Sequence, residues 1–225
     1  RGARLDRPDT PKPLVEVGGE PLILRVLEQL EAAGVERAVV VTGYEGDQLV
    51  RELTNHPKLG LQVEFVDSDN WQRGLAASVL AAESAFDSPF LIAMADHWFD
   101  QELVDAMVDS DPDDETVLAL IDKSLEDVYD LDSAVKVRAE GNRIAEVGFA
   151  LEEFNAVDAG LFAATTDLFD ACERALKQNE PAGLADAVEA LAADGKVGAH
   201  EVGDGSWYDI DTPPALVRGE MEHRD

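Results

Sequence analysis

Acidic residues follow two extended segments of the sequence, where they could hold a divalent cation. Asp96 ends the apolar run PFLIAMAD, and Asp209 and Asp211 occupy alternate positions in GSWYDIDTPPAL. Ligands of open α/β sheets bind beyond the carboxyl ends of strands, and residues two apart on a strand face the same side. Carboxylate oxygens suit Mg²⁺, so we predict that these residues contribute to a magnesium site. Asp211 has an alternative role, together with Thr212, as the cap of a helix that begins at Pro213 or Pro214.

The opening segment RGARLDRPDTPKPL concentrates positive charge in an acidic chain. Four of the 18 Lys and Arg residues lie in the first twelve positions, whereas Asp and Glu number 48 overall. A glycine such as Gly2 lets backbone N–H groups approach phosphate oxygens, and fixed cations such as Arg4 and Lys12 then neutralise a triphosphate. We therefore predict a polyanion site in this segment. The alternative is that its arginines only solvate a frayed terminus.

Composition limits the classes of protein to which the chain can belong. The chain has 225 residues, 45% of them hydrophobic, and a formal net charge of −30. This length and apolar content predict one domain with a substantial core. The net charge argues against nucleic-acid and anionic-membrane partners, which need a cationic face. Acidic residues on the expected helix faces predict a salt-adapted, halophilic surface, with an acidic mesophilic protein as the alternative.

The only cysteine is Cys172, so an intramolecular disulfide and a thiolate metal cluster are both excluded. Its position in LFDACERAL predicts a small core residue. The sequence contains neither a run of eighteen apolar residues nor a signal peptide, and we therefore expect a cytoplasmic protein. A homodimer is left open.

Hydrophobic periodicity alternates between helical and strand patterns over the first 130 residues. Such alternation predicts βαβ units, and hence an α/β fold with a doubly wound, mostly parallel sheet covered on both faces. The expected helices span residues 21–34, 46–53, 75–86 and 100–110. The expected strands span residues 37–43, 61–67, 89–96 and 116–122.

The pattern changes near residue 130. The segment SAVKVRAEGNRIAEVGF predicts two strands joined around Gly141-Asn142, a hairpin that a purely parallel sheet would not contain. Further strands are expected at 156–165 and 196–202, and helices at 166–177, 184–193 and 212–223. Because no Pro-, Gly- or Ser-rich linker separates the two parts, we predict a single domain, residues 1–225, with mixed or antiparallel strands in its second part.

The segment RGARL…PKPLVEVGGEPLI resembles the signature loop of the sugar-1-phosphate nucleotidylyltransferase superfamily. The matching residues, in order, are Arg4, Lys12, Leu14, Gly18 or Gly19, and Pro21. The resemblance extends from Gly2 to about Leu216 and implies a Rossmann-like, GT-A-like fold. Since the match begins inside the glycine loop, it also implies that a first strand and part of that loop lie before Gly2. The implied reaction joins a nucleoside triphosphate to a phosphorylated small alcohol or sugar, with Mg²⁺ as cofactor and pyrophosphate as product.

The resemblance also implies a role for each candidate residue. It makes residues 1–130 the nucleotide-binding half and residues 131–225 the acceptor-binding half. Arg4 and Lys12 become catalytic, and Asp96 and Asp209 become metal ligands, with Asp209 favoured over Asp211. The implied nucleotide-binding residues are Gly2, Arg73, Gly74 and Ser78. The implied substrate-binding residues are His97, Lys136, Asp158 and Gly160. Lys136 could instead be an exposed strand lysine, and His97 could make only structural hydrogen bonds.

The tripeptide Ala95-Asp96-His97 resembles the GDH of the archaeal-type inositol-1-phosphate cytidylyltransferases, which favours CTP and a phosphorylated polyol. Those relatives carry Gly-Lys-Asp after the hairpin, whereas this chain has Gly148-Phe149-Ala150 and lacks the expected cation. A uridylyl-, thymidylyl- or guanylyltransferase acting on a sugar 1-phosphate is the alternative within the class. Outside the class, the alternatives are a catalytically silent nucleotide-sugar-binding protein and a GT-A glycosyltransferase. The Arg4–Lys12 pair disfavours the glycosyltransferase, which has no triphosphate to activate.

Overall fold

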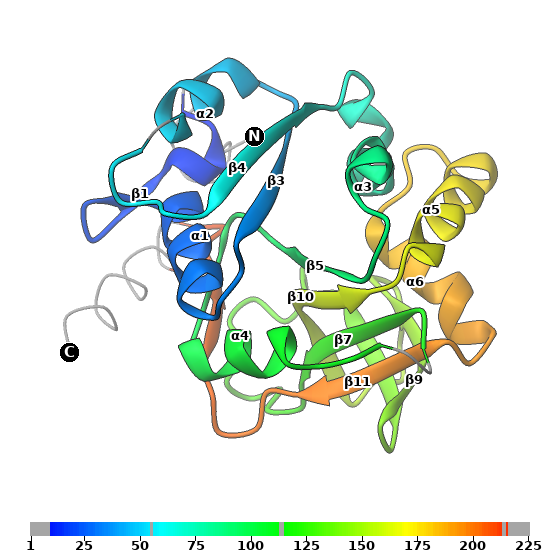
Figure 1. Cartoon of the computed structure of the whole chain (residues 1–225). Helices are drawn as coiled ribbons and strands as arrows, with labels where there is room; N and C mark the ends of the chain where they lie inside the picture. Colours follow the sequence, from blue (N-terminus) through cyan, green and yellow to red (C-terminus); the bar gives the residue numbers. More distant parts are fainter. Residues whose placement is uncertain (1–9, 55, 113–114, 213–214, 216–225) are drawn as a thin grey trace.

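Helices and strands alternate along the first half of the chain, as the hydrophobic periodicity predicts. The computed structural model describes residues 10–54, 56–112, 115–212 and 215 (Figure 1). Strands β3 (Arg37–Thr42) and β4 (Gln62–Asp67) pair in parallel, and the chain that connects them contains helix α2 (Gly46–Leu53). Helix α1 (Leu22–Ala32) packs its apolar side against this pair in a shared buried cluster. These elements confirm the predicted βαβ unit.

Five strands close into a small mixed barrel. They are β7 (Val117–Asp122), β8 (Lys136–Glu140), β9 (Arg143–Gly148), β10 (Ala156–Ala164) and β11 (Val197–Glu201). The order is β10-β7-β11-β9-β8, and β8 pairs again with β10 to close the ring. Only β7 and β11 pair in parallel within it. The hairpin β8–β9 confirms the one predicted around Gly141-Asn142.

Helices cover the barrel on two sides. In Figure 1, α3 (Leu75–Ala81), α5 (Asp167–Gln178) and α6 (Leu184–Ala193) lie together at the right. They share the largest buried cluster with the barrel strands, and Cys172 belongs to this cluster, which confirms it as a core residue. Burial raises the pKa of the Cys172 thiol to about 12, so the thiol stays protonated at neutral pH. Helix α4 (Gln101–Val108) packs against β7 and β10 in a second cluster.

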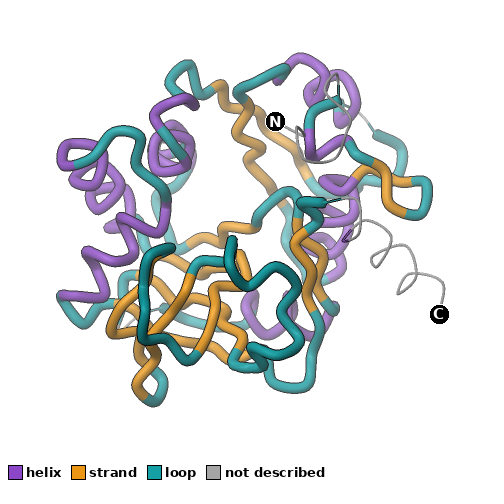
Figure 2. The backbone as a smooth tube through the Cα atoms, turned by 180° about the vertical axis from the view of Figure 1, so that it is seen from behind, coloured by secondary structure: helices purple, strands orange, loops and turns teal. Residues whose placement is uncertain are grey.

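The α/β class is confirmed, but the prediction of a mostly parallel sheet is wrong for the described residues. Strand β5 (Phe90–Ala93) pairs antiparallel with β10, and β3–β4 forms a separate two-stranded sheet. Seen from behind in Figure 2, β3 and β4 stand apart from the barrel strands. The prediction failed because a continuous apolar run indicates burial on both faces and carries no information on strand direction.

Several short elements escape the sequence patterns. Strands β1 (Glu16–Val17) and β2 (Glu20–Pro21) form a tiny hairpin, and β6 (His97–Phe99) pairs antiparallel with β12 (Trp207–Asp209). Strands of two or three residues are too short to show a period. The helix expected over 212–223 lies largely outside the described residues.

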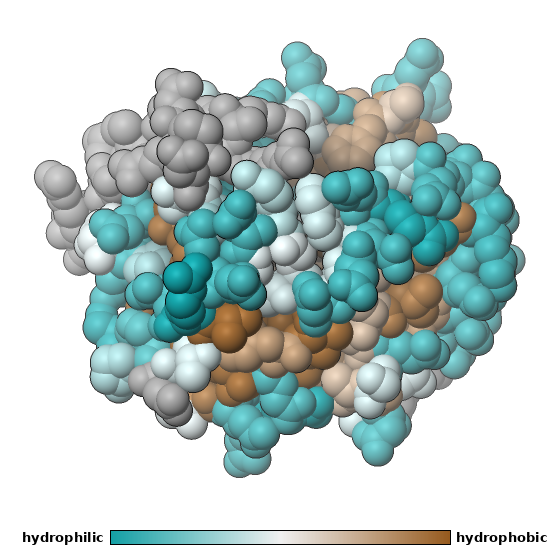
Figure 3. All heavy atoms as spheres, turned by 90° about the horizontal axis from the view of Figure 1, so that it is seen from above, coloured by the Kyte–Doolittle hydropathy of each residue, from teal (hydrophilic) through white to brown (hydrophobic). Residues whose placement is uncertain are grey.

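The outer surface agrees with the acidic composition. Hydrophilic side chains dominate the face shown in Figure 3, and apolar side chains appear there as patches. Among the described helices, none combines the length and the apolar character that crossing a bilayer requires.

Candidate active site

Lys12 brings together the acidic residues that the sequence places on separate segments. Its Nζ lies 2.6 Å from Asp96 Oδ2 and 3.1 Å from Asp209 Oδ1, and it also forms a close ion pair with Asp211 Oδ1. The Lys12 side chain is only 12% exposed. Asp209 and Asp211 therefore do face the same side, as their spacing predicts. The Thr212 Oγ1 accepts a 3.4 Å hydrogen bond from the Ala215 amide, as a capping residue would, whereas Asp211 is engaged by Lys12.

Local structure explains why these segments meet. Lys12 opens a short 3₁₀ helix (Lys12–Leu14) flanked by proline on both sides of the lysine, which fixes the backbone dihedral φ there. Asp96 follows β5, and the β6–β12 pairing sets Asp209 opposite His97. The Ile210 amide donates to the Asp96 carbonyl at 3.1 Å, which joins the two acidic segments directly.

A small buried cluster ties the lysine segment to the strand that carries Asp209. Val15 and Leu22, from the segment after Lys12, pack with Ile210, which directly follows Asp209. All three side chains are at most 1% exposed. This apolar packing fixes the segment that carries Lys12 against the segment that carries Asp209. It therefore limits how far the ion-paired side chains can separate.

Opposite charges in this cluster shift the pKa values of its members. Burial alone would lower the pKa of Lys12, but the carboxylates of Asp96 and Asp209 outweigh it and raise this pKa. Burial would raise the pKa of Asp96, but the hydrogen bond and charge of His97, together with Lys12, hold it well below its usual range. For Asp209, burial dominates and raises the pKa. Asp96 and Lys12 are therefore both ionised at neutral pH.

His97 is held tightly beside Asp96. Its Nδ1 lies 2.8 Å from Asp96 Oδ1, and its ring stacks on Trp207 at a centroid distance of 5.7 Å. Burial alone would lower the pKa of His97, but the hydrogen bond and charge of Asp96 raise it. The structural hydrogen bond proposed as the alternative role of His97 is thus present. It leaves Nε2 on the side of Gly160, where a Cβ would come within 2.8 Å of that nitrogen.

Trp207 and Asp122 complete this part of the site, and the sequence patterns did not single them out. Trp207 Nε1 donates a 2.9 Å hydrogen bond to Asp122 Oδ2, and Asp122 is only 8% exposed. The sequence nevertheless contains a pattern that could have identified each of these two residues. Trp207 alternates with Asp209 and Asp211 in the same extended segment, and Asp122 ends the apolar strand β7 as Asp96 follows β5.

The predicted acceptor-side residues lie on β8 and β10 of the barrel. The Gly160 amide donates to Asp158 Oδ1 at 2.8 Å, and burial raises the pKa of Asp158 to about 6. Gly160 has a φ of +81°, a conformation that favours glycine. Lys136 is buried at 9% exposure and donates to the Asp132 carbonyl at 2.7 Å, so it is not the exposed strand lysine of the alternative interpretation. Strand β8 pairs with β10 next to Asp158, with Lys136 opposite Val157.

The predicted nucleotide-side residues are not joined to the lysine cluster by any contact among the described residues. Arg73 makes a double hydrogen bond with Glu180, at 3.0 and 3.3 Å. Gly74, at φ +105°, is needed for packing, since a Cβ there would lie 2.1 Å from the Ala182 carbonyl oxygen. Ser78 lines an apolar cavity. Gly2 and Arg4 lie outside the described residues, so the roles of all five stay predictions.

The donor atoms fit a hard divalent cation. Asp96, His97 and Asp209 each offer one ligand atom, and these atoms lie within 4.8 Å of one another. The Lys12 ammonium sits between the carboxylates, which shows that the arrangement attracts a cation. Mg²⁺ prefers oxygen ligands, so the carboxylates of Asp96 and Asp209 are the two members of this set that suit it, while His97 Nδ1 is engaged with Asp96.

An α/β fold with a lysine and carboxylates gathered beyond the ends of its strands is the arrangement of the nucleotidyltransferases. The chain belongs to the family of MobA-like NTP transferase domains, whose family model matches residues 1–191. It is therefore a nucleotidyltransferase, as the sequence motifs predict.

Curated relatives are consistent with this family. The chain is 35% identical over 223 residues to the bifunctional IPC transferase and DIPP synthase of Rubrobacter xylanophilus, covering 97% of this chain and 49% of the relative. The protein of the same name from Archaeoglobus fulgidus is 30% identical over 208 residues, covering 92% of this chain and 39% of the relative. The chain thus spans half or less of the length of these relatives.

A solved structure supports the fold. The inositol-1-phosphate CTP transferase from T. maritima superimposes with a TM-score of 0.83 at 23% sequence identity, covering 98% of this chain and 92% of that one. At this identity the likeness concerns the fold alone.

Proposed function

We propose that the chain transfers a cytidylyl group from CTP to a phosphorylated polyol such as inositol 1-phosphate, releasing pyrophosphate. The observation that carries this proposal is the Lys12 ammonium held within 3.1 Å of both Asp96 and Asp209, beside His97. One cation among carboxylates suits charge neutralisation between two phosphorylated ligands. The names of the relatives above, which refer to IPC and to inositol-1-phosphate CTP transfer, support the choice of substrates.

The reaction needs no nucleophilic side chain. An oxygen of the acceptor phosphate forms a bond to the α-phosphorus of the triphosphate, and the bond to the bridging α–β oxygen breaks, so pyrophosphate leaves with that electron pair. The acceptor phosphate is already ionised at neutral pH, so the protein mainly aligns two polyanions and reduces their repulsion.

Each residue of the cluster then has a separate task. Lys12 neutralises and orients the α-phosphate and the attacking oxygen. Asp96 and Asp209, with Asp211 nearby, would hold Mg²⁺, which stabilises the charge on the phosphate oxygens when it is bound. His97, fixed by Asp96 and Trp207, presents Nε2 toward Gly160 on the acceptor side. Asp158 accepts hydrogen bonds from hydroxyl groups of the polyol when it is ionised.

The two halves of the chain would divide the ligands between them. Residues 1–130 would bind the triphosphate through Gly2, Arg4 and the segment that carries Arg73, Gly74 and Ser78. Residues 131–225 would bind the acceptor through β8 and β10, with Lys136 available to the acceptor phosphate. This division assigns the nucleotide to the GT-A-like part and the acceptor to the barrel.

A pyrophosphate-release assay tests the proposal. We would combine CTP, UTP, dTTP or GTP with inositol 1-phosphate, glycerol 3-phosphate or glucose 1-phosphate in the presence of Mg²⁺. The proposal predicts that CTP with inositol 1-phosphate gives the highest kcat/KM, and that Asp96→Asn lowers kcat by a factor of about 100 or more. Lys177→Met, a surface change on α5, is the control and should leave the rate unchanged. A preference for UTP with glucose 1-phosphate would contradict the choice of substrates, and binding without release would favour a silent nucleotide-sugar-binding protein.

A further inference from the structure

The indole of Trp207 links the barrel to the strand pair that carries His97. Its Nε1 donates a 2.9 Å hydrogen bond to Asp122 Oδ2, and its ring stacks on His97 at a centroid distance of 5.7 Å and an interplanar angle of 15°. Trp207 belongs to β12 and His97 to β6, whereas Asp122 is the last residue of β7 in the barrel. One side chain thus contacts both a barrel carboxylate and the ring beside Asp96.

Asp122 holds the indole from a rigid part of the fold. Its backbone lies opposite Val157 in the ladder between β7 and β10. Its side chain is buried, and each oxygen has a different partner: Oδ1 accepts a 2.8 Å hydrogen bond from the Ser124 amide, and Oδ2 accepts the bond from Trp207. The position of the carboxylate is therefore set by the barrel and by the turn that follows β7, and the indole is oriented by it.

Packing alone leaves the indole room to shift. A cavity of about 40 Å³ lies beside it, and its wall includes Asp122, Trp207 and residues 127–129 of the loop that follows β7. Interior side chains are held in place by packing only where voids are absent. A hydrogen bond to a buried carboxylate is directional, so it fixes the orientation that the packing leaves open.

The plane of the His97 ring depends on its aromatic neighbours. The hydrogen bond with Asp96, 2.8 Å long, fixes the position of Nδ1 but not the tilt of the ring. Phe99 lies at a centroid distance of 6.0 Å and an angle of 30°, and Trp207 is closer and more nearly parallel. Gly160 leaves space at Nε2, since a Cβ there would come within 2.8 Å of that nitrogen. A shift of the indole would therefore tilt the ring and turn Nε2 away from its present direction.

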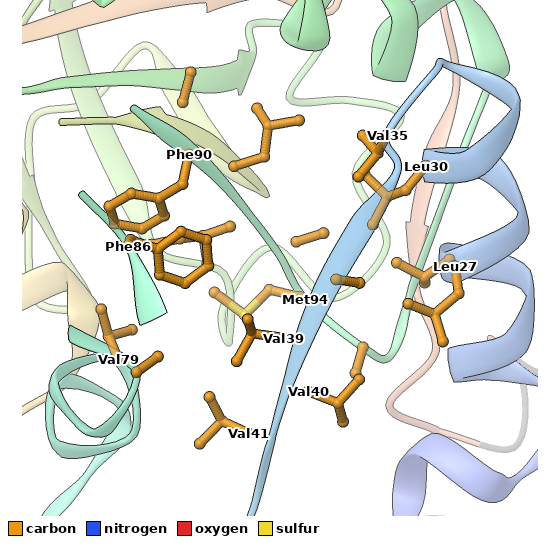
Figure 4. A pocket seen from close by; sticks show the side chains of 18 of the residues that line it. Leu27, Leu30, Val35, Val39, Val40, Val41, Val79, Phe86, Phe90 and Met94 are labelled. Atoms are coloured by element: carbon orange, nitrogen blue, oxygen red, sulfur yellow. The ribbon is translucent and has the colours of Figure 1, made fainter. Parts of the chain in front are cut away.

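The apolar cavity between β3 and β5 does not provide this support. Met94 belongs to its wall in Figure 4, and Ala95 also lines it, whereas His97, Trp207 and Asp122 do not. The segment that leads to His97 thus borders this cavity, but the ring itself is contacted from β6 and β12.

We infer that Asp122 is a positioning residue for the transfer reaction: through the Trp207 indole it sets the plane of the His97 ring, and thereby the direction in which Nε2 meets the acceptor. The inference rests on the proposed function, which assigns His97 to the acceptor side. Asp122 itself lies outside the described ligand atoms that could share one metal ion, which come from Asp96, His97 and Asp209. Because a misplacement of about 1 Å can lower a rate about 100-fold, a carboxylate that acts through another side chain can still have a large effect.

A purely structural role for Asp122 makes a different prediction. The bond from Ser124 stabilises the turn after β7, and losing it would lower stability without changing how the acceptor is used. Asp100 provides the matched case. Its Oδ2 accepts a 2.7 Å hydrogen bond from the Ser206 amide, one residue before Trp207, so it supports the same strand pair through the backbone and not through the indole.

Steady-state kinetics of Asp122→Leu and Asp100→Leu separate the two roles. Leucine keeps the branched shape at Cγ and removes the acceptor oxygens in both variants. With CTP and inositol 1-phosphate, or the substrate pair that the wild type prefers, Asp122→Leu should lower kcat/KM for the acceptor by a factor of about 10 or more and leave the KM for the triphosphate within a factor of about two. Asp100→Leu should leave both values within a factor of about two. Asp122→Asn, which keeps an acceptor oxygen, should recover most of the loss.

A double-mutant cycle with Trp207→Phe tests whether Asp122 acts through the indole. The phenyl ring can still stack on His97, but it has no N–H to donate. If the effect of Asp122 passes through this bond, Asp122→Leu should change kcat/KM for the acceptor no further in the Trp207→Phe background. The inference is overturned if the two effects multiply, or if Asp122→Leu lowers kcat/KM for the acceptor no more than Asp100→Leu does.

NMR of the ligand-free protein tests the positioning without any substrate. The Trp207 indole N–H and the His97 ring signals are assigned by their loss in Trp207→Phe and His97→Gln. In Asp122→Leu the indole proton should exchange with solvent about tenfold faster or more, and the His97 ring signals should shift, whereas Asp100→Leu should change neither. If Asp122→Leu does not fold, the His97 signals are compared in Trp207→Phe, which keeps Asp122 and its turn.

This measurement keeps the two proposals apart. Unchanged His97 ring signals would overturn the inference even in an active transferase. A wild-type protein that releases pyrophosphate from no substrate pair would overturn the proposed function, and the ring signals would still decide whether Asp122 positions His97.

Discussion

Replacing Lys12 by Met tests whether the lysine substitutes for a metal ion in the ligand-free protein. The change removes the ammonium and keeps the length and apolar character of the side chain. It leaves Asp96, Asp209 and Asp211 facing one another without the cation that now lies 2.6 and 3.1 Å from the first two. In the absence of metal, we therefore expect Lys12→Met to lower the free energy of unfolding.

The size of the effect follows from the exposure of the partners. A unit charge pair 4 Å apart at an effective dielectric constant of 20 is worth about 4 kcal/mol, and removing one member of a buried pair costs about 3–5 kcal/mol. The carboxylates are 27%, 39% and 31% exposed, so solvent screens part of this. We expect a loss of about 2–3 kcal/mol in EDTA at pH 7. Excess Mg²⁺ should restore about 2.7 kcal/mol at one hundred times its Kd.

Urea unfolding with and without Mg²⁺ measures both quantities. The matched control is Lys177→Met, which removes an exposed lysine paired with Glu173 on α5 and should change the free energy of unfolding by less than about 0.5 kcal/mol. Because the pKa of Asp96 is lowered in the folded protein, its share of the stability is present above about pH 4 and is lost as the pH falls further. The reasoning is refuted if Lys12→Met is as stable as the wild type in EDTA, or if Mg²⁺ stabilises the two proteins equally.

Four further substitutions probe the neighbourhood of His97. Gly160→Ala places a Cβ 2.7 Å from the His97 ring, at a residue whose φ is +81°. It should lower the free energy of unfolding, measured in urea, by about 1–3 kcal/mol, and an unchanged value would show that the ring can move away freely. Asp158→Asn removes a carboxyl whose pKa is raised to about 6, so it should raise the free energy of unfolding by up to about 3 kcal/mol above pH 6 and leave it unchanged below pH 4. An equal gain at both pH values contradicts the raised pKa. Trp207→Phe keeps a ring over His97 but removes the hydrogen bond to Asp122, so thermal unfolding should show a stability lower by about 1–3 kcal/mol. Asp122→Asn should lower the stability less, because its amide oxygen can still accept the hydrogen bond from Trp207.

The sequence predicts the acidic part of the site because strand ends are visible in it. An apolar run that stops at Asp96 indicates a carboxylate beyond the end of a strand, and the alternation of Asp209 and Asp211 indicates one shared side. Both features depend only on local periodicity, and the structure brings all three carboxylates to Lys12. The stacking of His97 on Trp207 depends instead on the pairing of two three-residue strands about 110 positions apart, for which the sequence has no periodic signal.

Strand direction was the part of the fold that local patterns could not predict. The apolar runs of β5, β7 and β10 correctly indicate strands, but whether two such strands run parallel depends on the path of the connecting chain. Gly74 illustrates the same limit for a single residue. Its motif suggests contact with a nucleotide, whereas its φ of +105° and its approach to the Ala182 carbonyl show that packing alone already requires glycine.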